Sequence, residues 1–157
     1  MRTIDKLLNE YGESHQNGTN KIIHWICIPL IMFSLVGVLW SIPFPKNILN
    51  GWITIGSVVI MLSMLYYIRL SIPLFVGFLG IGGLLIVGNY FLFEYINHDY
   101  LKMFEISFII FFLAWVGQFY GHKIEGKKPS FLKDLQFLLI GPAWLLHFIY
   151  KKIGINY

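Results

Sequence analysis

The sequence predicts an all-α integral membrane protein with four transmembrane helices, a C-terminal interfacial or re-entrant helical segment, and both termini in the cytoplasm. Three observations support this prediction: charged residues are few, four long apolar runs follow one another, and lysine and arginine gather in alternate connections. Only 13% of the 157 residues are charged, whereas about 25% are charged in a soluble domain. The mean hydropathy is +0.67. We therefore expect one membrane domain over residues 1–157.

The four spans are placed by the length of the apolar runs. A hydrocarbon core about 30 Å thick requires about 20 helical residues. Runs near that length predict spans near residues 22–43, 51–68, 72–93 and 104–121. The third run is rich in glycine, which lets membrane helices approach closely, so this span is expected to be a packing helix. Its glycines are Gly77, Gly80, Gly82, Gly83 and Gly88.

The orientation follows from the basic residues. The N-terminal segment, the second connection and the tail hold ten of the twelve lysines and arginines, and the other two connections hold only Lys46 and Lys102. The positive-inside rule then places both termini in the cytoplasm, at the inner membrane of a bacterium or the endoplasmic reticulum of a eukaryote. Because the net charge of +4 lies in short segments between apolar runs, the expected partner is the lipid bilayer and no nucleic acid.

The apolar tail at 131–150 raises the question of a fifth span. Gly141 and Pro142 interrupt it, and a crossing would carry Lys151 and Lys152 to the side with few basic residues. An interfacial or re-entrant helix pair is therefore predicted. The first 21 residues contain no apolar stretch of signal-peptide length, so no cleaved targeting segment is expected.

The histidines indicate where chemistry could take place. His15 precedes the first span, His24 lies just inside its cytoplasmic end, and His122 lies at the cytoplasmic end of the fourth span. Because the number of spans is even, these three fall on one face of the membrane, and His98 falls on the other. Cys27 is the only cysteine, so a metal would be held by histidine, carboxylate or water and no intramolecular disulfide is expected.

Helical spacing groups other polar residues with these histidines. Asn20 precedes His24 by four residues, Gln118 precedes His122 by four, and Glu125 follows His122 by three. Polar groups in membrane spans are costly unless they face a bundle interior, so a functional site is expected here. Neutral imidazole suits zinc, copper, iron and nickel, and histidine with carboxylate and open positions is typical of non-haem iron oxygenases.

Structural interpretations remain open for the same residues. A histidine near the end of a span is often an interfacial residue bonded to water or backbone, and Asn17 and Asn20 suit a turn and a helix N-cap. Glu125 could offset Lys127 and Lys128, which also suit a solvated basic loop. On this interpretation the chain is a non-catalytic membrane protein, such as a small transporter subunit or lipid-binding scaffold.

Two stretches of the sequence resemble a known family. They are YGESHQNGTNKIIH at residues 11–24, followed by Pro29, and WVGQFYGHKIE at 115–125, followed by Lys127, Lys128 and Pro129. Together they are similar to the signature stretches of the small membrane 2-hydroxy fatty acid dioxygenases, a family named for a fungal phytosphingosine-metabolism protein. Asp134 and Gly141-Pro142 also look similar to its downstream segment. The resemblance spans most of the chain.

The resemblance implies an iron(II)-dependent α-oxidation, in which a 2-hydroxy fatty acid and O2 give CO2 and a fatty acid one carbon shorter. It implies His15, His24 and His122 as iron ligands. Accompanying polar positions match four residues, of which Asn20, Gln118 and Glu125 would serve catalysis and Asn17 substrate binding. The sequence departs from the family pattern at Glu125, which lies one position closer to His122. Its role as ligand or as neighbour to a ligand therefore stays open.

The same resemblance suggests how the substrate would bind. The hydroxyl and carboxylate oxygens of a 2-hydroxy acid can chelate one metal ion, and three protein ligands would leave a position for O2. Lys127 and Lys128 would then attract the carboxylate. The acyl chain would lie among the apolar helices. Metal identity, chain-length preference and oligomeric state stay open at this point.

Overall fold

The computed structural model describes residues 2–44, 52–126 and 137–156, and these ranges form helices and no strands. The helices are α1 (Thr3–Glu13), α2 (Gly18–Trp40), α3 (Ile55–Leu70), α4 (Ile72–Tyr95), α5 (Tyr100–Glu125) and α7 (Ile140–Ile153). The all-α prediction is confirmed. Lys127 and Lys128 lie outside the described residues.

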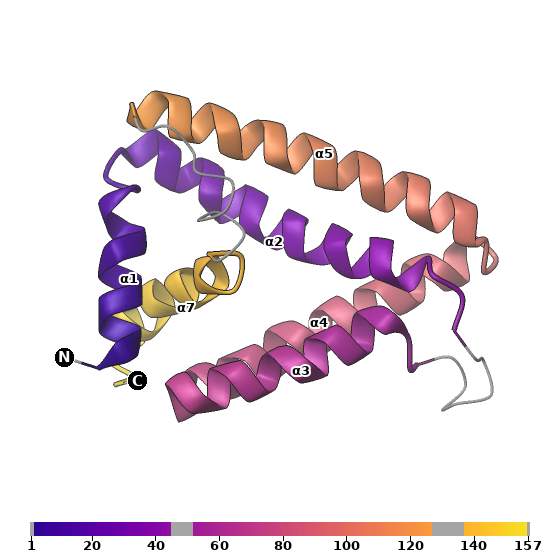
Figure 1. Ribbon diagram of the computed structural model, residues 1–157, viewed down its shortest axis with the longest axis horizontal. Coiled ribbons are helices and arrows are strands. Elements are labelled where there is room, and N and C mark those ends of the chain that lie inside the picture. Colours follow the sequence, from indigo (N-terminus) through magenta and orange to yellow (C-terminus); the bar gives the residue numbers. More distant parts are fainter. Residues whose placement is uncertain (1, 45–51, 127–136, 157) are drawn as a thin grey trace.

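Helix α2 is the centre of the fold. Its most extensive contact is with α5, and it also packs against α3, α4 and α7. Figure 1 shows α2 and α5 side by side, the antiparallel pair α3 and α4 diverging from them, and α1 with α7 in the wedge that this leaves. The wedge lies at the end of the molecule opposite the turn between α4 and α5.

Three helices are long and apolar enough to cross a membrane. These are α2, α4 and α5, with 23, 24 and 26 residues. Helix α3 is apolar but has 16 residues, which gives a length of about 24 Å at 1.5 Å per residue. The structure therefore supports a membrane protein with at least three candidate spans, and the assignment of α3 as a fourth span stays a prediction.

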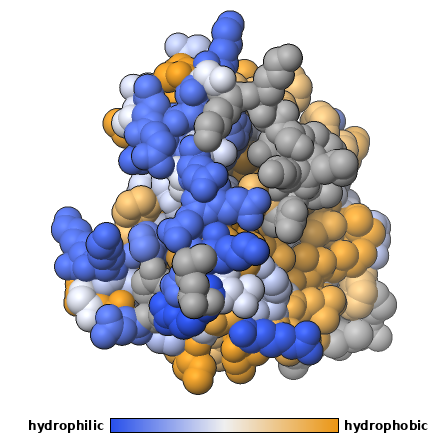
Figure 2. Space-filling view, turned by 60° about the vertical axis from the view of Figure 1, so that its left-hand side comes forward, coloured by the Kyte–Doolittle hydropathy of each residue, from blue (hydrophilic) through white to orange (hydrophobic). Residues whose placement is uncertain are grey.

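The surface of the helices agrees with a lipid environment. Large apolar side chains are exposed along α3, α4 and α5, with Leu84 75% exposed and Leu113 61% exposed. Monomeric soluble proteins rarely expose contiguous apolar surface on this scale. Figure 2, which brings the end carrying α1 and α7 forward, shows hydrophilic side chains gathered over that end and hydrophobic surface beside them. The molecule thus has a polar end and apolar flanks.

The glycines of α4 only partly act as predicted. A Cβ at Gly82 would meet Met64 of α3 at 2.7 Å, and one at Gly88 would meet Phe33 of α2 at 3.0 Å. Gly77 likewise faces the Tyr150 hydroxyl of α7. These three allow close packing, as small residues do at membrane helix contacts. Gly80 and Gly83 face open space, so their expected packing role is wrong.

Helix α1 was not predicted from the sequence. Its apolar residues Ile4, Leu8 and Tyr11 recur at helical spacing and are buried. They pack against α7, which follows more than a hundred residues later. An isolated helix of 11 residues is marginal in water. The stability of α1 therefore depends on a tertiary contact that no local sequence pattern predicts.

Helix α7 forms the later part of the apolar tail; residues 131–136 lie outside the described residues, so the interfacial or re-entrant helix pair stays a prediction. Gly141 and Pro142 lie in the first turn of this helix, where proline is tolerated. All of its first seven residues are buried in the wedge. Tyr150 donates a hydrogen bond to the Pro73 carbonyl (2.6 Å), and Tyr67 donates one to the Leu139 carbonyl (2.6 Å). The apolar residues at the start of α7 thus pack against the other helices.

The membrane orientation can be tested with reporter fusions. Fusions at residues 1 and 157 are expected to report the cytoplasm, and an insertion beside His98 the opposite side, because ten of the twelve basic residues lie in the segments predicted to be cytoplasmic. Paired phosphatase and fluorescent reporters provide the measurement. A cytoplasmic signal beside His98 would contradict the four-span topology.

Candidate metal centre

Three histidines converge at the polar end of the molecule. His15 lies in the loop between α1 and α2, His24 on the second turn of α2, and His122 on the last turn of α5. One ring nitrogen from each lies within 4.8 Å of the others. The ring centroids are 4.2 Å apart for His15 and His24 and 5.1 Å apart for His24 and His122. All three side chains are buried.

Backbone carbonyls select the tautomer of two of these rings. His15 Nδ1 lies 2.6 Å from the Tyr11 carbonyl oxygen, and His24 Nδ1 lies 2.9 Å from that of Asn20. A carbonyl oxygen can only accept, so each Nδ1 carries the hydrogen and each Nε2 keeps a lone pair. Gln118 lies near His24, but no hydrogen bond of acceptable geometry joins a described residue to the buried Nε2 of His24.

This arrangement fits a metal ion. Metal-bound histidines generally donate their second ring N–H to a carbonyl or carboxylate, as His15 and His24 do here. Two nitrogens bound to one ion at about 2.1 Å lie at most about 4.2 Å apart, so small side-chain rotations would bring this group onto one centre. Three neutral imidazoles leave positions open for further ligands.

Glu125 joins the last turn of α5 to the loop that carries His15. Its carboxylate accepts hydrogen bonds from the backbone N–H groups of Gln16 (2.8 Å) and Asn17 (2.9 Å). It also accepts one from Asn20 Nδ2 (3.0 Å), which donates in addition to the Ser14 carbonyl (3.2 Å). Bonds to an ionised carboxylate are the stronger kind, and its charge lies at the positive end of α2. These contacts favour a positioning role for Glu125.

The described residues give Asn17 a structural role. Its side-chain oxygen accepts from the backbone N–H groups of Thr19 (2.9 Å) and Asn20 (3.3 Å), which makes it the N-cap of α2. This agrees with the structural interpretation of Asn17, and its substrate-binding role stays a prediction. The expected roles of Lys127 and Lys128 fall outside the described residues.

Two aromatic residues beside the histidines were not predicted. The Tyr11 ring stacks on His15 with centroids 4.2 Å apart, and Trp144 of α7 lies 5.2 Å from the same ring. Tyr11 precedes His15 by one helical turn, a spacing that could have indicated the contact. Trp144 had no such signal, because α7 reaches the site only through the tertiary fold. Together they form an apolar wall behind His15.

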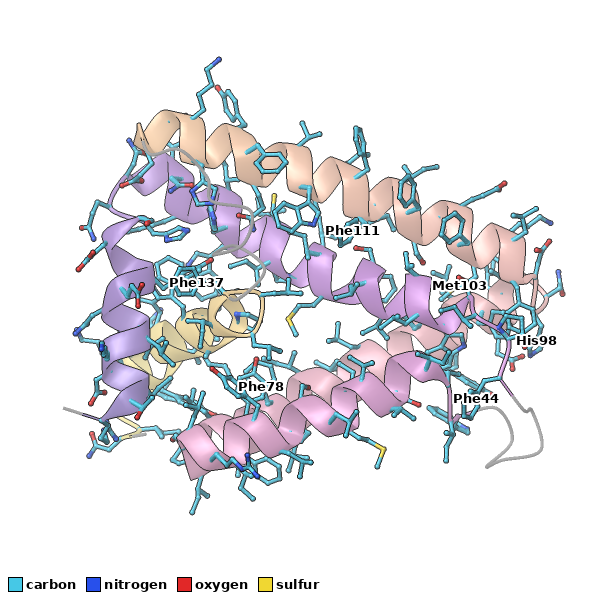
Figure 3. The ribbon with its side chains drawn as sticks, viewed as in Figure 1. Phe44, Phe78, His98, Met103, Phe111 and Phe137 are labelled. Carbon is cyan, nitrogen blue, oxygen red and sulfur yellow. The ribbon has the colours of Figure 1, made fainter. Side chains whose placement is uncertain are left out.

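A pocket adjoins the histidines between α2, α5 and the start of α7. It encloses about 410 Å³ of empty space, including its open mouth. Its polar lining comes mainly from Gln118 and His122, and Ile31 and Trp115 lie among its apolar walls. Figure 3 shows Phe137, another lining residue, at the end where α1 and α7 meet, with His98 at the far end of the molecule. His98 therefore has no part in this site.

Known proteins similar in sequence indicate the family of this chain. Residues 1–153 match the family model described as 2-hydroxy-palmitic acid dioxygenase Mpo1-like. The chain is also similar to a curated relative, the 2-hydroxy-palmitic acid dioxygenase MPO1 of Saccharomyces cerevisiae. The two are 29% identical over 149 residues, which cover 94% of this chain and 79% of the relative. No solved structure matches the chain.

The matched range contains both stretches on which the resemblance was based, and it includes all three converging histidines. The family model covers far more than half of the sequence, so the match extends over nearly the whole chain and not over one motif alone. The chain belongs to the Mpo1-like family.

Proposed function

We propose that this protein is an iron(II)-dependent dioxygenase that shortens 2-hydroxy fatty acids by one carbon. A 2-hydroxy acid and O2 would give the next shorter fatty acid, CO2 and water, with cleavage of the bond between the carboxyl carbon and the carbon bearing the hydroxyl. The cluster of three buried histidines carries the proposal. Membership of the Mpo1-like family gives the substrate class.

His15, His24 and His122 are the proposed iron ligands. Iron(II) bound there would supply oxygen activation and a centre that chelates the hydroxyl and carboxylate oxygens of the substrate. The carbonyls of Tyr11 and Asn20 keep two imidazoles in the tautomer that exposes Nε2. Glu125 and Asn20 hold the His15 loop against α5. Gln118, which lines the pocket, would hydrogen-bond to the polar head of the substrate.

The architecture supports a reaction at a membrane surface. The histidines lie at the polar end of the molecule, whereas the flanks of the helices are apolar. A fatty acid in a bilayer likewise has a polar end and an apolar part, because its carboxylate lies at the interface and its chain lies in the hydrocarbon. We place the site on the cytoplasmic face, where Lys127 and Lys128 would attract the carboxylate.

The reaction can be tested by mass spectrometry. Purified protein supplied with iron(II) and oxygen is expected to convert 2-hydroxyhexadecanoic acid to the fifteen-carbon acid. Hexadecanoic acid should react poorly, because it lacks the second chelating oxygen. A chelator should abolish turnover, and readdition of iron(II) should restore it.

Elemental analysis of anaerobically purified protein distinguishes the metals and tests the non-catalytic alternative. Iron close to one equivalent per chain is expected. Bound metal without a shortened product at any chain length would reject the dioxygenase. Protein that neither binds metal nor turns over would support a lipid-binding scaffold with interfacial histidines.

A further inference from the structure

An apolar groove runs along α5 away from the histidines. Aromatic side chains of α5 from Phe108 to Phe119 form one wall, and Leu35 of α2 and Leu138 form the other. The groove encloses about 810 Å³ of empty space, including its open side. Figure 3 shows one of the aromatic residues, Phe111, on the side of α5 that faces α2.

The groove adjoins the pocket beside the histidines. Trp115 and Leu138 line both spaces, so the two are neighbours with these side chains between them. The pocket beyond them contains the polar groups of Gln118 and His122, whereas every residue that lines the groove is apolar. A molecule that occupied both would need a polar head and an apolar tail.

The open side of the groove faces the region expected to hold lipid. Phe108 is 49% exposed and Phe112 59% exposed. Both lie on α5, one of the candidate spans. One face of α5 carries a stripe of side chains, because their positions recur at spacings of four and three residues. The stripe consists of Phe108, Phe112, Trp115, Phe119 and His122. The stripe therefore leads from the bilayer to a proposed metal ligand.

The length of this stripe matches a long acyl chain. Fourteen residues separate Phe108 from His122, which is about 21 Å of helix at 1.5 Å per residue. An extended sixteen-carbon chain is about 20 Å long, from a zigzag of carbon–carbon bonds of roughly 1.5 Å. An eight-carbon chain would end near the level of Trp115.

We propose that this groove holds the acyl chain of the substrate, which enters sideways from the bilayer and passes Trp115 and Leu138 to bring its head to the histidines. The inference rests on the proposed function, since it takes a 2-hydroxy fatty acid as the occupant. The groove then orients a substrate that already resides in lipid. It selects long chains because their far carbons lie against the aromatic residues of α5.

A filling substitution tests the groove by its effect on chain-length selectivity. Leu35→Trp places a bulky ring in the groove, and Leu30→Trp adds the same ring to a 41% exposed position of α2 that lines neither space. Leu35→Trp is expected to lower the ratio of kcat/KM for 2-hydroxyhexadecanoic to 2-hydroxyoctanoic acid about tenfold or more, because small misplacements at the reacting centre are costly in rate. Leu30→Trp should keep the wild-type ratio. An unchanged ratio in Leu35→Trp would overturn the proposal.

Photolabelling gives a reading that does not depend on turnover. The probe is 2-hydroxyhexadecanoic acid with a diazirine near its last carbon, added to wild-type protein in phosphatidylcholine nanodiscs. Labels are expected on peptides around Phe108 and Leu35, and excess unlabelled 2-hydroxyhexadecanoic acid should suppress them. Equal, uncompeted labelling of the exposed face of α4, such as Leu84, would reject the groove.

The two experiments separate failure of the groove from failure of the reaction. If wild-type protein shortens the substrate but the label lies elsewhere, the groove is wrong and the dioxygenase stands. If no product forms and competed labels still lie in the groove, the chain binds the fatty acid there without oxidising it.

Discussion

Replacement of His24 or His122 by alanine is expected to remove most of the bound metal while leaving extractable, monodisperse protein. Each change deletes one of three donor nitrogens. Loss of an outer partner of a metal site typically costs about 10–100-fold in affinity, so loss of a ligand should cost more. Both residues lie near helix ends, and the remaining packing should preserve the fold. Metal content by mass spectrometry and turnover should fall together.

His98→Ala is the matched control for these variants. His98 is exposed, pairs with Glu94 at 2.9 Å, and lies at the far end of the molecule. An exposed pair of this kind contributes little to stability. The substitution should therefore leave metal content and turnover unchanged. Full metal occupancy in both His24→Ala and His122→Ala would show that the cluster is not the site.

Gly121→Ala is expected to impair both stability and metal binding. Gly121 lies where α5 crosses the start of α2, and a Cβ there would collide with the Asn20 side-chain oxygen and lie 3.4 Å from His24 Cε1. Asn20 cannot easily withdraw, because it bonds both Glu125 and Ser14. Overpacking of this kind costs about 1–3 kcal/mol. Thermal unfolding in detergent and metal titration would measure the two effects.

Gly83→Ala provides the comparison for Gly121→Ala. Gly83 lies inside α4 and faces open space. Alanine favours a helix over glycine by about 0.5–1 kcal/mol in water, so this variant should be neutral or slightly more stable. Similar losses in the two variants would mean that any added methyl group is harmful and would contradict the specific contact at Asn20.

The candidate site was largely predictable because its signals are periodic. The predicted even number of spans placed His24 and His122 at the same end, and the structure brings these residues together. Asn20 and Gln118 follow from the same helical spacing. Glu125 was placed near the site, but its partners were not predictable, because the backbone N–H groups of Gln16 and Asn17 belong to a loop.

The missed elements share one physical cause. Helix α1 is amphipathic and short, and its apolar face is stabilised by α7. The packing of α7 against α1, α2 and α4 was not predictable, because hydropathy cannot distinguish burial in lipid from burial in protein. Gly80 and Gly83 were expected to pack because they are small, yet which glycines face a neighbour depends on how α4 is rotated.

The sequence by itself determined the membrane class, the all-α fold, the approximate positions of the long apolar helices and the family, since these depend on composition, run length and ordered motifs. Only the tertiary structure decided that the loop carrying His15 joins the other two histidines, that Tyr11 and Trp144 enclose it, and that a groove leads along α5. These features depend on distances between residues far apart in the chain. Side-chain packing between helices sets those distances, and the local periodicity of the sequence does not predict them.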